Sequence, residues 1–489
     1  MDQPASVDVL IVGAGVSGLG AAYYLQRDHP GRSYAILEAR GASGGTWDLF
    51  RYPGVRSDSD LHTFGYEFRP WRSDVAIADA GSILGYLRET AAAYGIDKHI
   101  RYRTRVTAAA WSPASARWEV TTEDTETGER SVIRCAWLFC AAGYYRYDEG
   151  FTPDFAGRDR FSGPVVHPQH WPDDLSYAGK RVAVIGSGAT AVTLVPAMAP
   201  AAAHVTMVQR TPSYVIPLPA RDKLNARLTR ILGTDRGYAV TRRKNIVRQE
   251  LLWRFCRRYP KTARRLIRRL NARLLPDGYP VDEHFNPPYD PWDQRLCLAA
   301  DADLFRVIRR GQASVVTGQI ETFTEDGLRL RDGRLVEADI IVTATGLNVQ
   351  AIGGIALTVD GEPVRLPDTV AYKGTMLSGV PNFCYVFGYT NASWTLRVGP
   401  LCEHFTRLLS YLDERGYDSV RPAAAVPGTA TRPLLDLRSG YLTRAFDELP
   451  RQGTSGPWRT PPAYSADARA LRRPVGEPEL EFSRKVFGK

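Results

Sequence analysis

The sequence is poor in cysteine, with six residues in 489, far below the density of a disulfide-stapled secreted domain. Cys135 and Cys140 have the spacing of a redox pair, but they lie in the apolar run CAWLFC. Residues five apart in a strand point to opposite faces, so we interpret both as buried thiols. The low cysteine content favours a reducing, cytoplasmic compartment.

Long hydrophobic runs are also missing. No stretch of the sequence approaches the roughly 20 apolar residues of a membrane span, so we expect no segment that crosses a bilayer. The start, MDQPASVDVLIVG, has an acidic residue and no basic region before its apolar run, so we expect no export signal. At roughly 150 residues per domain, the length predicts a protein of several domains.

Acidic residues are scarce in one segment. Between Arg221 and Arg273, 18 Lys and Arg face only Asp222, Asp235 and Glu250, an excess larger than the net charge of +10 of the whole chain. The basic character therefore belongs to this segment and not to the protein as a whole, and we expect no nucleic-acid partner.

This basic segment has helical periodicity. An apolar stripe follows the helical spacing, and four arginines fall largely outside it: the stripe is Leu266, Ile267, Leu270, Leu274 and Leu275, and the arginines are Arg264, Arg265, Arg268 and Arg269. One interpretation is a solvated charged face on helices that pack through their stripes. The other is peripheral contact with an anionic membrane through the helices of residues 221–275.

A glycine-rich loop follows the first apolar strand. Residues 7–12 form a continuous β-rich run, and Gly13-x-Gly15-x-x-Gly18 comes directly after it, followed by the helix-forming run LGAAYYLQ. Gly13 permits a tight turn, Gly15 lets the backbone approach a pyrophosphate, and Gly18 lets helix and strand pack closely. The helix N-terminus attracts the anion.

The second strand, SYAILE, ends at Glu38, twenty residues after Gly18. A carboxylate at this position accepts hydrogen bonds from the ribose hydroxyls of an adenosine and repels a 2′-phosphate. The first unit therefore predicts a site for FAD or NAD.

The same strand, loop and helix pattern recurs in the middle of the chain. The strand RVAVI precedes the loop Gly186-Ser187-Gly188-Ala189-Thr190-Ala191, and the next strand ends at Gln209 and Arg210 instead of an acid. Arg210 suits the 2′-phosphate of NADPH through charge-assisted hydrogen bonds, and Gln209 adds a neutral one. The alternative for Arg210 is a surface arginine at a strand end. Two such units predict two dinucleotides, which leaves FAD for the first.

These patterns predict an α/β fold with two Rossmann-like dinucleotide-binding domains, for FAD and NADP, and a helical insertion in the NADP domain. We expect the FAD domain to comprise residues 1–150 and 344–489, with a linker at 151–176. The NADP domain is then 177–343, with the basic helices at about 213–290. The Pro-rich stretch RPAAAVPGTATRP after residue 420 is expected to be loop and surface covering.

Three longer signatures carry a resemblance to a known family. The first is Phe161-x-Gly163-x-x-x-His167-x-x-x-Trp171-Pro172, the second is Gly44-Gly45-Thr46-Trp47 with Tyr52-Pro53-Gly54 and Asp58, and the third is Asp339 with Ala344-Thr345-Gly346. The sequence resembles the class B flavoprotein monooxygenases, within them the Baeyer–Villiger monooxygenases, and most closely the ethionamide-activating FAD-containing monooxygenases. The match covers about Asp8 to about Trp458. The Trp171-Pro172 ending is the form typical of the Baeyer–Villiger group.

The resemblance implies an activity. NADPH reduces FAD, the reduced flavin reacts with O2, and one oxygen atom is inserted beside a ketone carbonyl to give an ester or lactone, with oxidation of sulfides or thioamides as a further activity. Such chemistry requires a fixed positive charge near the reacting oxygens, which the resemblance places on Arg295, with Asp58 as its partner. One alternative is a flavin-containing monooxygenase of sulfur or nitrogen compounds. The other is a membrane-associated NADPH-flavin reductase or electron-transfer protein.

The resemblance also implies further contacts. Ser17 is expected at the pyrophosphate, Val106 at the adenine, and Phe161, Gly163, His167 and Trp171 in a linker that couples reduction to oxygenation. Residues along the flavin or beside NADP are Gly45, Thr46, Trp47, Asp48, Leu49, Arg56, Ser57 and Asp58. Many relatives have a lysine where this chain has Gln294, so the preference for NADPH rests on Arg210. No metal site is expected.

Overall fold

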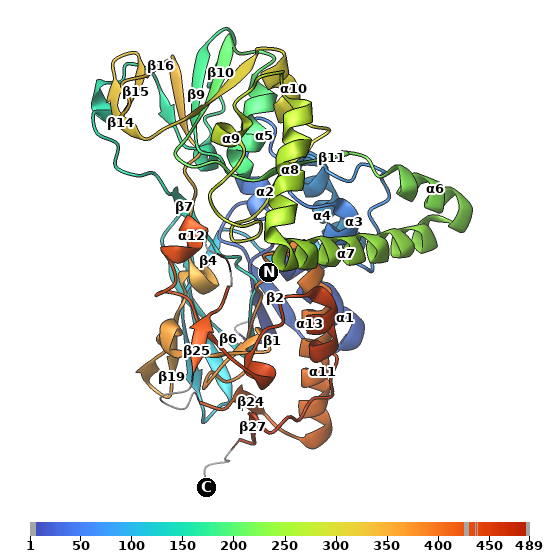
Figure 1. The fold of residues 1–489 in the computed structure, drawn as a ribbon. Coiled ribbons are helices and arrows are strands. Elements are labelled where there is room, and N and C mark those ends of the chain that lie inside the picture. The colour runs from blue at the N-terminus through green and yellow to red at the C-terminus, as the bar shows by residue number, and fades with distance from the viewer. Residues whose placement is uncertain (1–5, 425–429, 436, 438, 486–489) are drawn as a thin grey trace.

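The structure is a computed structural model that describes residues 6–424, 430–435, 437 and 439–485 (Figure 1). Each of the two glycine-rich loops follows a strand in the middle of its own sheet. The chain builds most of the first sheet, then the second, and then returns to the first.

The first sheet has the strand order β20-β19-β4-β5-β6-β1-β2-β3, with β23 alongside β6. Its central strand β1 pairs in parallel with β2 and β6, so β1 is buried on both faces, which explains its unbroken apolar sequence. The strands are β1 (Ser6–Val12), β2 (Tyr34–Leu37), β3 (Ile100–Arg101), β4 (Thr104–Ser112), β5 (Arg117–Asp124), β6 (Arg130–Cys140), β19 (Ala356–Val359), β20 (Glu362–Pro363) and β23 (Phe383–Tyr385).

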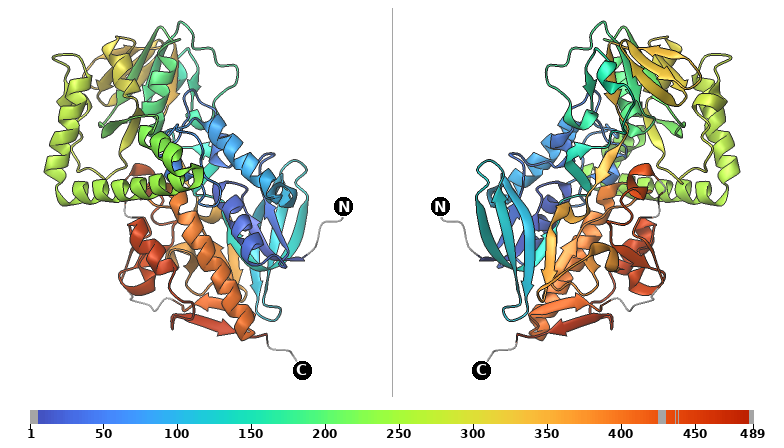
Figure 2. Two further views of the ribbon diagram at one scale, coloured as in Figure 1. Left: turned by 90° about the vertical axis from the view of Figure 1, so that its right-hand side faces the viewer. Right: turned by 90° about the vertical axis from the view of Figure 1, so that its left-hand side faces the viewer.

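Helices from both ends of the chain complete the core of the first sheet. The helix α1 (Val16–Asp28) packs against α11 (Val398–Arg415), and α4 (Ala80–Ala93) joins the same apolar cluster (Figure 2). The short helices α2 (Thr46–Leu49) and α3 (Leu61–Phe64) lie on the connection between β2 and α4. The part of the chain after residue 344 is therefore integral to the first sheet.

The second sheet is entirely parallel, with the order β13-β10-β9-β17-β8. Its strands are β8 (Val165–Val166), β9 (Arg181–Ile185), β10 (His204–Gln209), β13 (Ala313–Thr317) and β17 (Ile340–Thr343). The helices α5 (Ala189–Met198) and α10 (Asp303–Arg309) pack on it. Strand β8 lies inside the segment 151–176, so that segment contributes an edge strand to this sheet.

Smaller elements join these sheets. They are β7 (Tyr145–Gly150), which pairs with β18 (Leu347–Val349), the antiparallel β14 (Ile320–Thr324), β15 (Gly327–Leu330) and β16 (Leu335–Glu337), and the hairpin of β21 (Ala371–Tyr372) with β22 (Met376–Leu377). The β7–β18 pair lies where the chain passes between the two sheets.

The strands β11 (Val215–Leu218) and β12 (Cys297–Ala300) pair in a separate two-stranded sheet. Four helices lie between them in the chain: α6 (Lys223–Leu232), α7 (Thr234–Arg258), α8 (Pro260–Leu274) and α9 (Val281–His284). The α6–α7 hairpin projects from the side of the molecule, and α8 runs back to the second sheet (Figure 1).

The predicted packing stripe of α8 is only partly correct. Ile267 and Leu275 are buried, but Leu266 and Leu270 are 49% and 38% exposed. The packed face is centred on Ala263, Ile267 and Asn271 instead, so it is rotated around the helix relative to the predicted stripe.

The chain after residue 420 contributes to the core, which the expectation of loop and surface covering did not include. Its elements are β24 (Ser419–Pro422), β25 (Thr431–Pro433), α12 (Gly440–Thr443), β26 (Arg451–Gly453), α13 (Tyr464–Leu471) and β27 (Leu480–Ser483). Leu442 and Leu449 are buried in the core of the first sheet. Residues 425–429 of the Pro-rich stretch lie outside the described residues.

A buried ion pair attaches this C-terminal part to α11. The guanidinium of Arg397 lies 2.9 Å from the carboxylate of Asp467 on α13, and both side chains are almost fully buried.

All six cysteines are buried and unpaired. Among the described residues, no helix is both long enough and apolar enough to cross a bilayer.

Candidate functional site

The two glycine-rich loops have the same local construction. Gly13 has a φ of +101°, and a Cβ there would lie 2.6 Å from the carbonyl oxygen of Ala141, which follows β6. Gly186 has a φ of +137°, and a Cβ there would lie 2.2 Å from the carbonyl oxygen of Ala344, which follows β17. Only glycine combines this backbone conformation with such a close approach, so each loop passes tightly over the end of the neighbouring strand.

Both loops open onto helix N-termini that no side chain caps. Gly15 is the N-cap of α1 and Gly188 is the N-cap of α5, and neither helix start carries a side-chain capping hydrogen bond. The N–H groups of the first turns, which include Ser17 and Thr190, are therefore directed toward an anion. A Cβ at Gly188 would meet no atom within 4 Å. The backbone at both loops thus fits the pyrophosphate of a dinucleotide, with Ala189 and Ala191 in the second loop.

Glu38 is held next to the first loop. Its carboxylate accepts hydrogen bonds from the N–H groups of Ala14 at 2.8 Å and Arg40 at 2.9 Å. Burial raises the pKa of Glu38, and these two hydrogen bonds oppose the rise. The carbonyl of Glu38 also accepts from Thr104, two residues before Val106. Val106 is buried at the start of β4, so both predicted adenosine contacts lie in one region.

The Gly44-to-Leu49 segment lies across the first loop. The N–H of Gly44 donates to the carbonyl of Ala14 at 3.0 Å, and Gly45 faces Gly15. Thr46 lies 3.2 Å from the hydroxyl of Tyr147. Trp47 packs on the core of the first sheet. The segment therefore forms a second wall beside the predicted flavin position.

The carboxylate of Asp48 is occupied by two arginines. Arg40 contacts it at 2.6 Å and Arg88 at 2.9 Å, and Asp48 is buried. This side chain therefore anchors α2 through ion pairs, and its neighbour Leu49 is buried beside it.

The segment from Tyr52 to Asp58 joins the two domains. Tyr52 lies beside Thr190 of the second loop, and burial raises the pKa of Tyr52 to about 12. Arg56 forms a 2.5 Å ion pair with Asp303 on α10. Ser57 is buried and donates to the carbonyl of Ser59. This chain segment is thus fixed against the helices of the second sheet next to the second loop.

Arg295 and Asp58 meet between the two loops although 237 residues separate them. Nη2 of Arg295 lies 3.1 Å from Oδ1 of Asp58, and Nε lies 3.0 Å from Oδ2. The side chains are 27% and 38% exposed. Burial alone would lower the pKa of Arg295, but the charge of Asp58 and the nearby phenols outweigh it and raise that pKa. The guanidinium is therefore a fixed positive charge.

The loop that carries Arg295 is pinned. Asp293 pairs with Arg257 at the end of α7 at 3.0 Å. Trp292 has a φ of +73°, a left-handed conformation that is costly for a tryptophan and is often found at functional sites.

Three tyrosines lie near Arg295, and no motif of the sequence pointed to them. The hydroxyls of Tyr144 and Tyr145 lie 2.5 Å apart, and Tyr441 lies near Tyr144. Burial raises the pKa of all three phenols. Tyr144 also stacks on Trp394, with ring centroids 4.4 Å apart. A cluster of neutral hydroxyl groups and aromatic rings therefore lies near Arg295.

The residues of the Phe161-to-Trp171 signature contact both of the regions that the linker joins. Nε2 of His167 lies 3.0 Å from the carbonyl of Gly346 in the third signature, while Nδ1 accepts from the N–H of Gln169, so we assign the ring proton to Nε2. Gly163 packs on the carbonyl of Asp339. Phe161 and Trp171 pack against clusters of the NADP domain.

Gln209 and Arg210, at the end of β10, differ in burial and in hydrogen bonding. The amide of Gln209 is buried and donates to the carbonyl of His284 and to Thr317, both at 2.9 Å. Its N–H groups are therefore already used inside the domain. Arg210 is exposed, and no carboxylate of the described residues pairs with it. Ser187 bonds the carbonyl of Thr211 at 2.9 Å, which holds the second loop beside this position.

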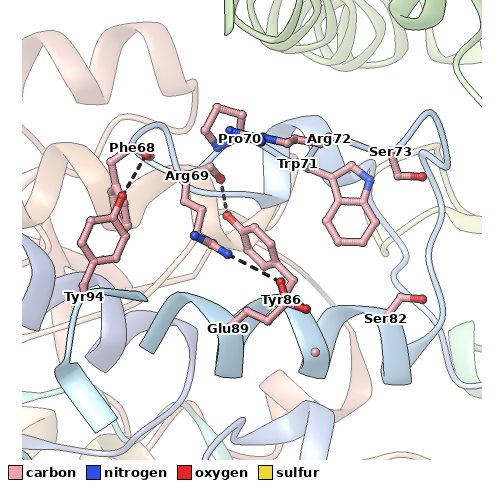
Figure 3. Close-up of a pocket in the computed structure, with 11 residues that line it drawn as sticks. Phe68, Arg69, Pro70, Trp71, Arg72, Ser73, Ser82, Tyr86, Glu89 and Tyr94 are labelled. Carbon is pink, nitrogen blue, oxygen red and sulfur yellow. Dashed lines mark hydrogen bonds and ion pairs between the residues drawn. The ribbon is translucent and has the colours of Figure 1, made fainter. Parts of the chain in front are cut away.

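A surface hollow lies elsewhere. It has a volume of about 630 Å³ and is lined by Phe68, Trp71, Tyr86, Tyr94 and other residues around α4 (Figure 3). It contains neither Arg295 nor any residue of the glycine loops, and we base no assignment on it.

Comparison with protein families decides the identity. The model of the flavin-binding monooxygenase-like family matches residues 74–351, and that of the NAD(P)-binding Rossmann-like domain matches residues 11–75. This chain is a flavin-binding monooxygenase.

Relatives of this monooxygenase span its whole length. It is 51% identical over 484 residues to the FAD-containing monooxygenase EthA of Mycobacterium tuberculosis, with 98% of each chain covered. It is 49% identical to the putative FAD-containing monooxygenase MymA of the same species, with 97% of each covered. The flavin-binding monooxygenase thus belongs to the group that the sequence resembles.

Solved structures share its fold. A steroid monooxygenase bound to NADP has a TM-score of 0.77 at 22% identity and covers 98% of this chain and 100% of its own. The complex of OTEMO with FAD and NADP has a TM-score of 0.69 at 25% identity and covers 86% and 88%. The predictions of an α/β fold with Rossmann-like domains, of FAD and NADPH as cofactors, and of a Baeyer–Villiger-type monooxygenase are confirmed.

Proposed function

We propose that this monooxygenase inserts one oxygen atom of O2 beside a ketone carbonyl and gives an ester or lactone. The observation that carries the proposal is the two-point contact of Arg295 with Asp58 between the two nucleotide loops. Bound FAD supplies the activated oxygen, and NADPH supplies the electrons. The remaining requirement is a fixed positive charge where negative charge develops on the substrate, and Arg295 meets it.

We propose separate roles for the atoms of the ion pair. Nε and Nη2 of Arg295 are used by Asp58, whereas Nη1 makes no hydrogen bond with the described residues. Nη1 is therefore the donor available to the carbonyl oxygen of a ketone. Asp58 fixes the plane of the guanidinium, which determines where Nη1 points. Asp58 acts as a positioning residue in this proposal.

The phenols beside Arg295 support a second activity on sulfur. Oxygen transfer to a sulfide or thioamide needs a proton donor for the oxygen atom that is not transferred. Oxidation of a ketone needs stabilisation of a developing negative charge. The pKa values of Tyr144 and Tyr145 are raised by burial, so their hydroxyls stay protonated and can donate. We propose oxidation of sulfides or thioamides as a side activity of the same site.

The proposal also covers the coupling of flavin reduction to oxygenation and the preference for NADPH. We propose that His167, through its contact with Gly346, holds the linker while NADP remains bound between reduction and oxygenation. Arg210 is the proposed contact to the 2′-phosphate, because Gln209 is occupied. For the other residues that the sequence suggested as cofactor contacts, we propose the same contacts, at the positions described above.

We also propose a cytoplasmic location with peripheral contact to an anionic membrane through the helices of residues 221–275. The two alternatives without ketone oxygenation are less well supported. A plain flavin reductase does not require a charged pair between the nucleotide loops, and the family is one of monooxygenases.

The test uses the purified holoenzyme with NADPH, ¹⁸O₂ and a panel of cyclic and linear ketones. The proposal predicts esters or lactones that carry one ¹⁸O atom. Consumption of NADPH with hydrogen peroxide as the only product from every ketone would overturn it. Sulfoxide formation without ester would make sulfur oxidation the main function.

A further inference from the structure

The helix α7 buries polar side chains and exposes apolar ones, which is the reverse of an ordinary surface helix. Its buried residues include Thr241, Arg242 and Asn245, which are polar or charged. Its outward residues include Val240, Val247 and Leu251, which are 44%, 49% and 58% exposed. A surface helix normally buries its apolar stripe and exposes its polar one. An outward apolar face on a folded protein indicates a binding surface.

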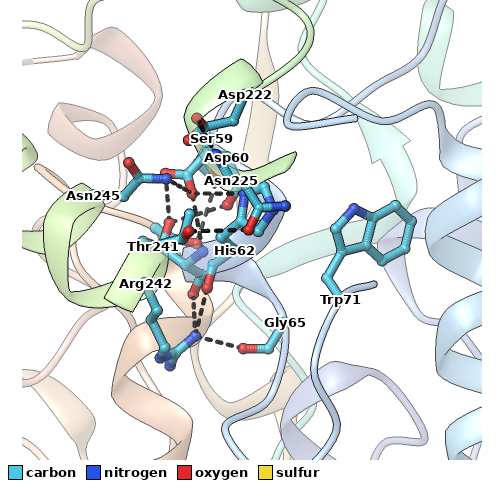
Figure 4. A network of polar contacts seen from close by, with 12 residues as sticks. Ser59, Asp60, His62, Gly65, Trp71, Asp222, Asn225, Thr241, Arg242 and Asn245 are labelled. Carbon is cyan, nitrogen blue, oxygen red and sulfur yellow. Dashed lines mark hydrogen bonds and ion pairs between the residues drawn. The ribbon is translucent and has the colours of Figure 1, made fainter. Parts of the chain in front are cut away.

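A polar network on the inner side of α7 fixes this orientation (Figure 4). Asn245 donates to Asp60 at 2.8 Å, and Nη1 of Arg242 donates to the carbonyl of Gly65 at 2.7 Å. Thr241 donates to Asn225 of α6 at 3.0 Å, which joins the two helices. Rotation of α7 to bury its apolar side would break all of these hydrogen bonds and leave buried polar groups unpaired, which is unfavourable.

The apolar side chains of α7 follow helical spacing. Val240, Val247 and Leu251 recur at positions i, i+7 and i+11, which places them on one face, opposite Tyr238 and Asn245. Most of the large hydrophobic side chains exposed by the described residues belong to this region: Leu224, Ile231, Leu232, Val240, Val247, Leu251, Leu252, Tyr259, Leu266 and Leu270.

Helix α6 extends the face. Leu224, Leu228 and Ile231 recur at positions i, i+4 and i+7, and Ile231 is 77% exposed. On each helix the stripe lies about a quarter turn from the residues that join α6 to α7, which include Asn225 and Thr241. In an antiparallel hairpin this arrangement directs both stripes to the same side, away from α3. The exposed fractions of Ile231, Val240, Val247 and Leu251 place this side toward solvent.

Arginines border this apolar face. Arg236, Arg243 and Arg258 are exposed on α7 beside its stripe, and the segment 221–273 carries 18 basic residues against three acidic ones. An apolar stripe bordered by arginines is the composition of an interfacial helix on an anionic bilayer. Two copies of this chain that met through the face would instead bring their arginines together, so the charge disfavours self-association.

We propose that the outer face of the α6–α7 hairpin docks on an anionic lipid bilayer, with Leu224, Ile231, Val240, Val247 and Leu251 inserted among the lipids. The proposal deepens the peripheral membrane contact proposed above and does not depend on which substrate the enzyme oxidises. The arginines bind the lipid phosphates, and the inner polar network keeps the hairpin attached to the body.

The test is co-sedimentation of the full-length holoenzyme with vesicles at low and at moderate salt. The vesicles are phosphatidylcholine alone or phosphatidylcholine with roughly 30% of the anionic lipid phosphatidylglycerol, which attracts basic segments. We expect binding to the mixed vesicles that weakens with salt, and at least tenfold weaker binding to phosphatidylcholine. Absence of binding to the mixed vesicles overturns the proposal.

Two double variants distinguish vesicle binding through the apolar face from nonspecific hydrophobic adsorption. We expect Ile231→Ser with Leu251→Ser to weaken vesicle binding at least tenfold at both salt concentrations and to leave NADPH oxidation unchanged. The matched control is Val132→Ser with Leu335→Ser, two side chains that are 54% and 58% exposed outside the hairpin. Vesicle binding by the Ile231/Leu251 variant at the wild-type level contradicts the proposal. A further outcome also overturns the proposal. If the wild type does not bind vesicles but forms a dimer, and the Ile231/Leu251 variant is monomeric, the face binds a second copy of the chain.

Discussion

Asp58 and Arg295 form a two-point ion pair, with Nε at 3.0 Å and Nη2 at 3.1 Å from the two carboxylate oxygens. The two residues lie in distant parts of the chain, 237 residues apart. The pair therefore forms only when these two parts of the fold are packed so that the side chains meet. The ion pair occupies the Nε–Nη2 edge of the guanidinium and leaves Nη1 for the reaction.

Removal of the charge of Asp58 tests its positioning role. We expect Asp58→Asn to lower the rate of ester formation roughly tenfold, because loss of a partly exposed two-point pair amounts to about 1–2 kcal/mol. The rate of flavin reduction by NADPH is expected to change less than threefold. Stopped-flow reduction and ester assays measure the two separately. Asp332→Asn, which removes a surface partner of Arg334, is the control, and equal losses in both variants would contradict the role.

The phenol beside Arg295 predicts a selective effect on the oxygenation step. Tyr144→Phe keeps the ring that stacks on Trp394 but removes the hydroxyl that bonds Tyr145. We expect sulfide oxidation to fall more than ketone oxidation, by at least threefold, because only the former requires a proton donor. Tyr385→Phe removes a buried hydroxyl that has no partner among the described residues and should leave both activities unchanged. An equal loss of both activities in Tyr144→Phe indicates a packing effect instead.

Arg210 predicts the choice between the two nicotinamide cofactors. We expect Arg210→Ala to raise the KM for NADPH at least tenfold and the KM for NADH less than twofold, because only NADPH carries the 2′-phosphate. Steady-state kinetics with both cofactors measure this. Arg310→Ala, an exposed arginine of the same domain, is the control, and a parallel rise of both KM values in Arg210→Ala refutes the assignment.

His404 predicts acid sensitivity of the fold. Burial, with Lys373 and Arg407 nearby, lowers the pKa of His404 to about 3, whereas an unfolded histidine has a pKa of about 6.5. Below pH 6.5 the unfolded chain therefore binds a proton that the folded one excludes. The free energy of unfolding falls through this residue by up to about 1.4 kcal/mol per pH unit until the pH nears 3.

Urea unfolding of the wild type and of His404→Gln at several pH values measures that contribution. The amide of Gln replaces the hydrogen bond from the His404 ring to the carbonyl of Leu471. We expect the variant to lose less stability than the wild type between pH 6.5 and 5 and to show no such advantage above pH 7. Identical pH profiles would exclude His404 as a cause.

The sequence predicted those parts of the site that are local in the chain. The strand, the loop of Gly13 to Gly18 and Glu38 lie within one supersecondary unit, where periodicity and turn chemistry are readable. The pairing of Asp58 with Arg295 came from resemblance, because no local pattern links residues 237 positions apart. Tyr144 and Tyr441 were not predicted for the same reason, since they meet only when the C-terminal part folds back.

The helical insertion shows where periodicity misleads. The stripe predicted on α8 was displaced, and α7 exposes Val247 and Leu251 while it buries Arg242. A hydrophobic pattern identifies a helix face but not the direction in which that face points. The direction here follows from the hydrogen bonds of Arg242 and Asn245 to the α3 region, which depend on tertiary contacts.

The most direct test of the central claim is the ratio of ester to hydrogen peroxide formed by Arg295→Ala under NADPH and O2. If Arg295 stabilises the negative charge on the ketone oxygen, ester formation falls at least about a hundredfold. Flavin reduction by NADPH stays within about threefold, and the oxygen consumed appears as hydrogen peroxide. Ester formed at near the wild-type rate by Arg295→Ala would contradict the account.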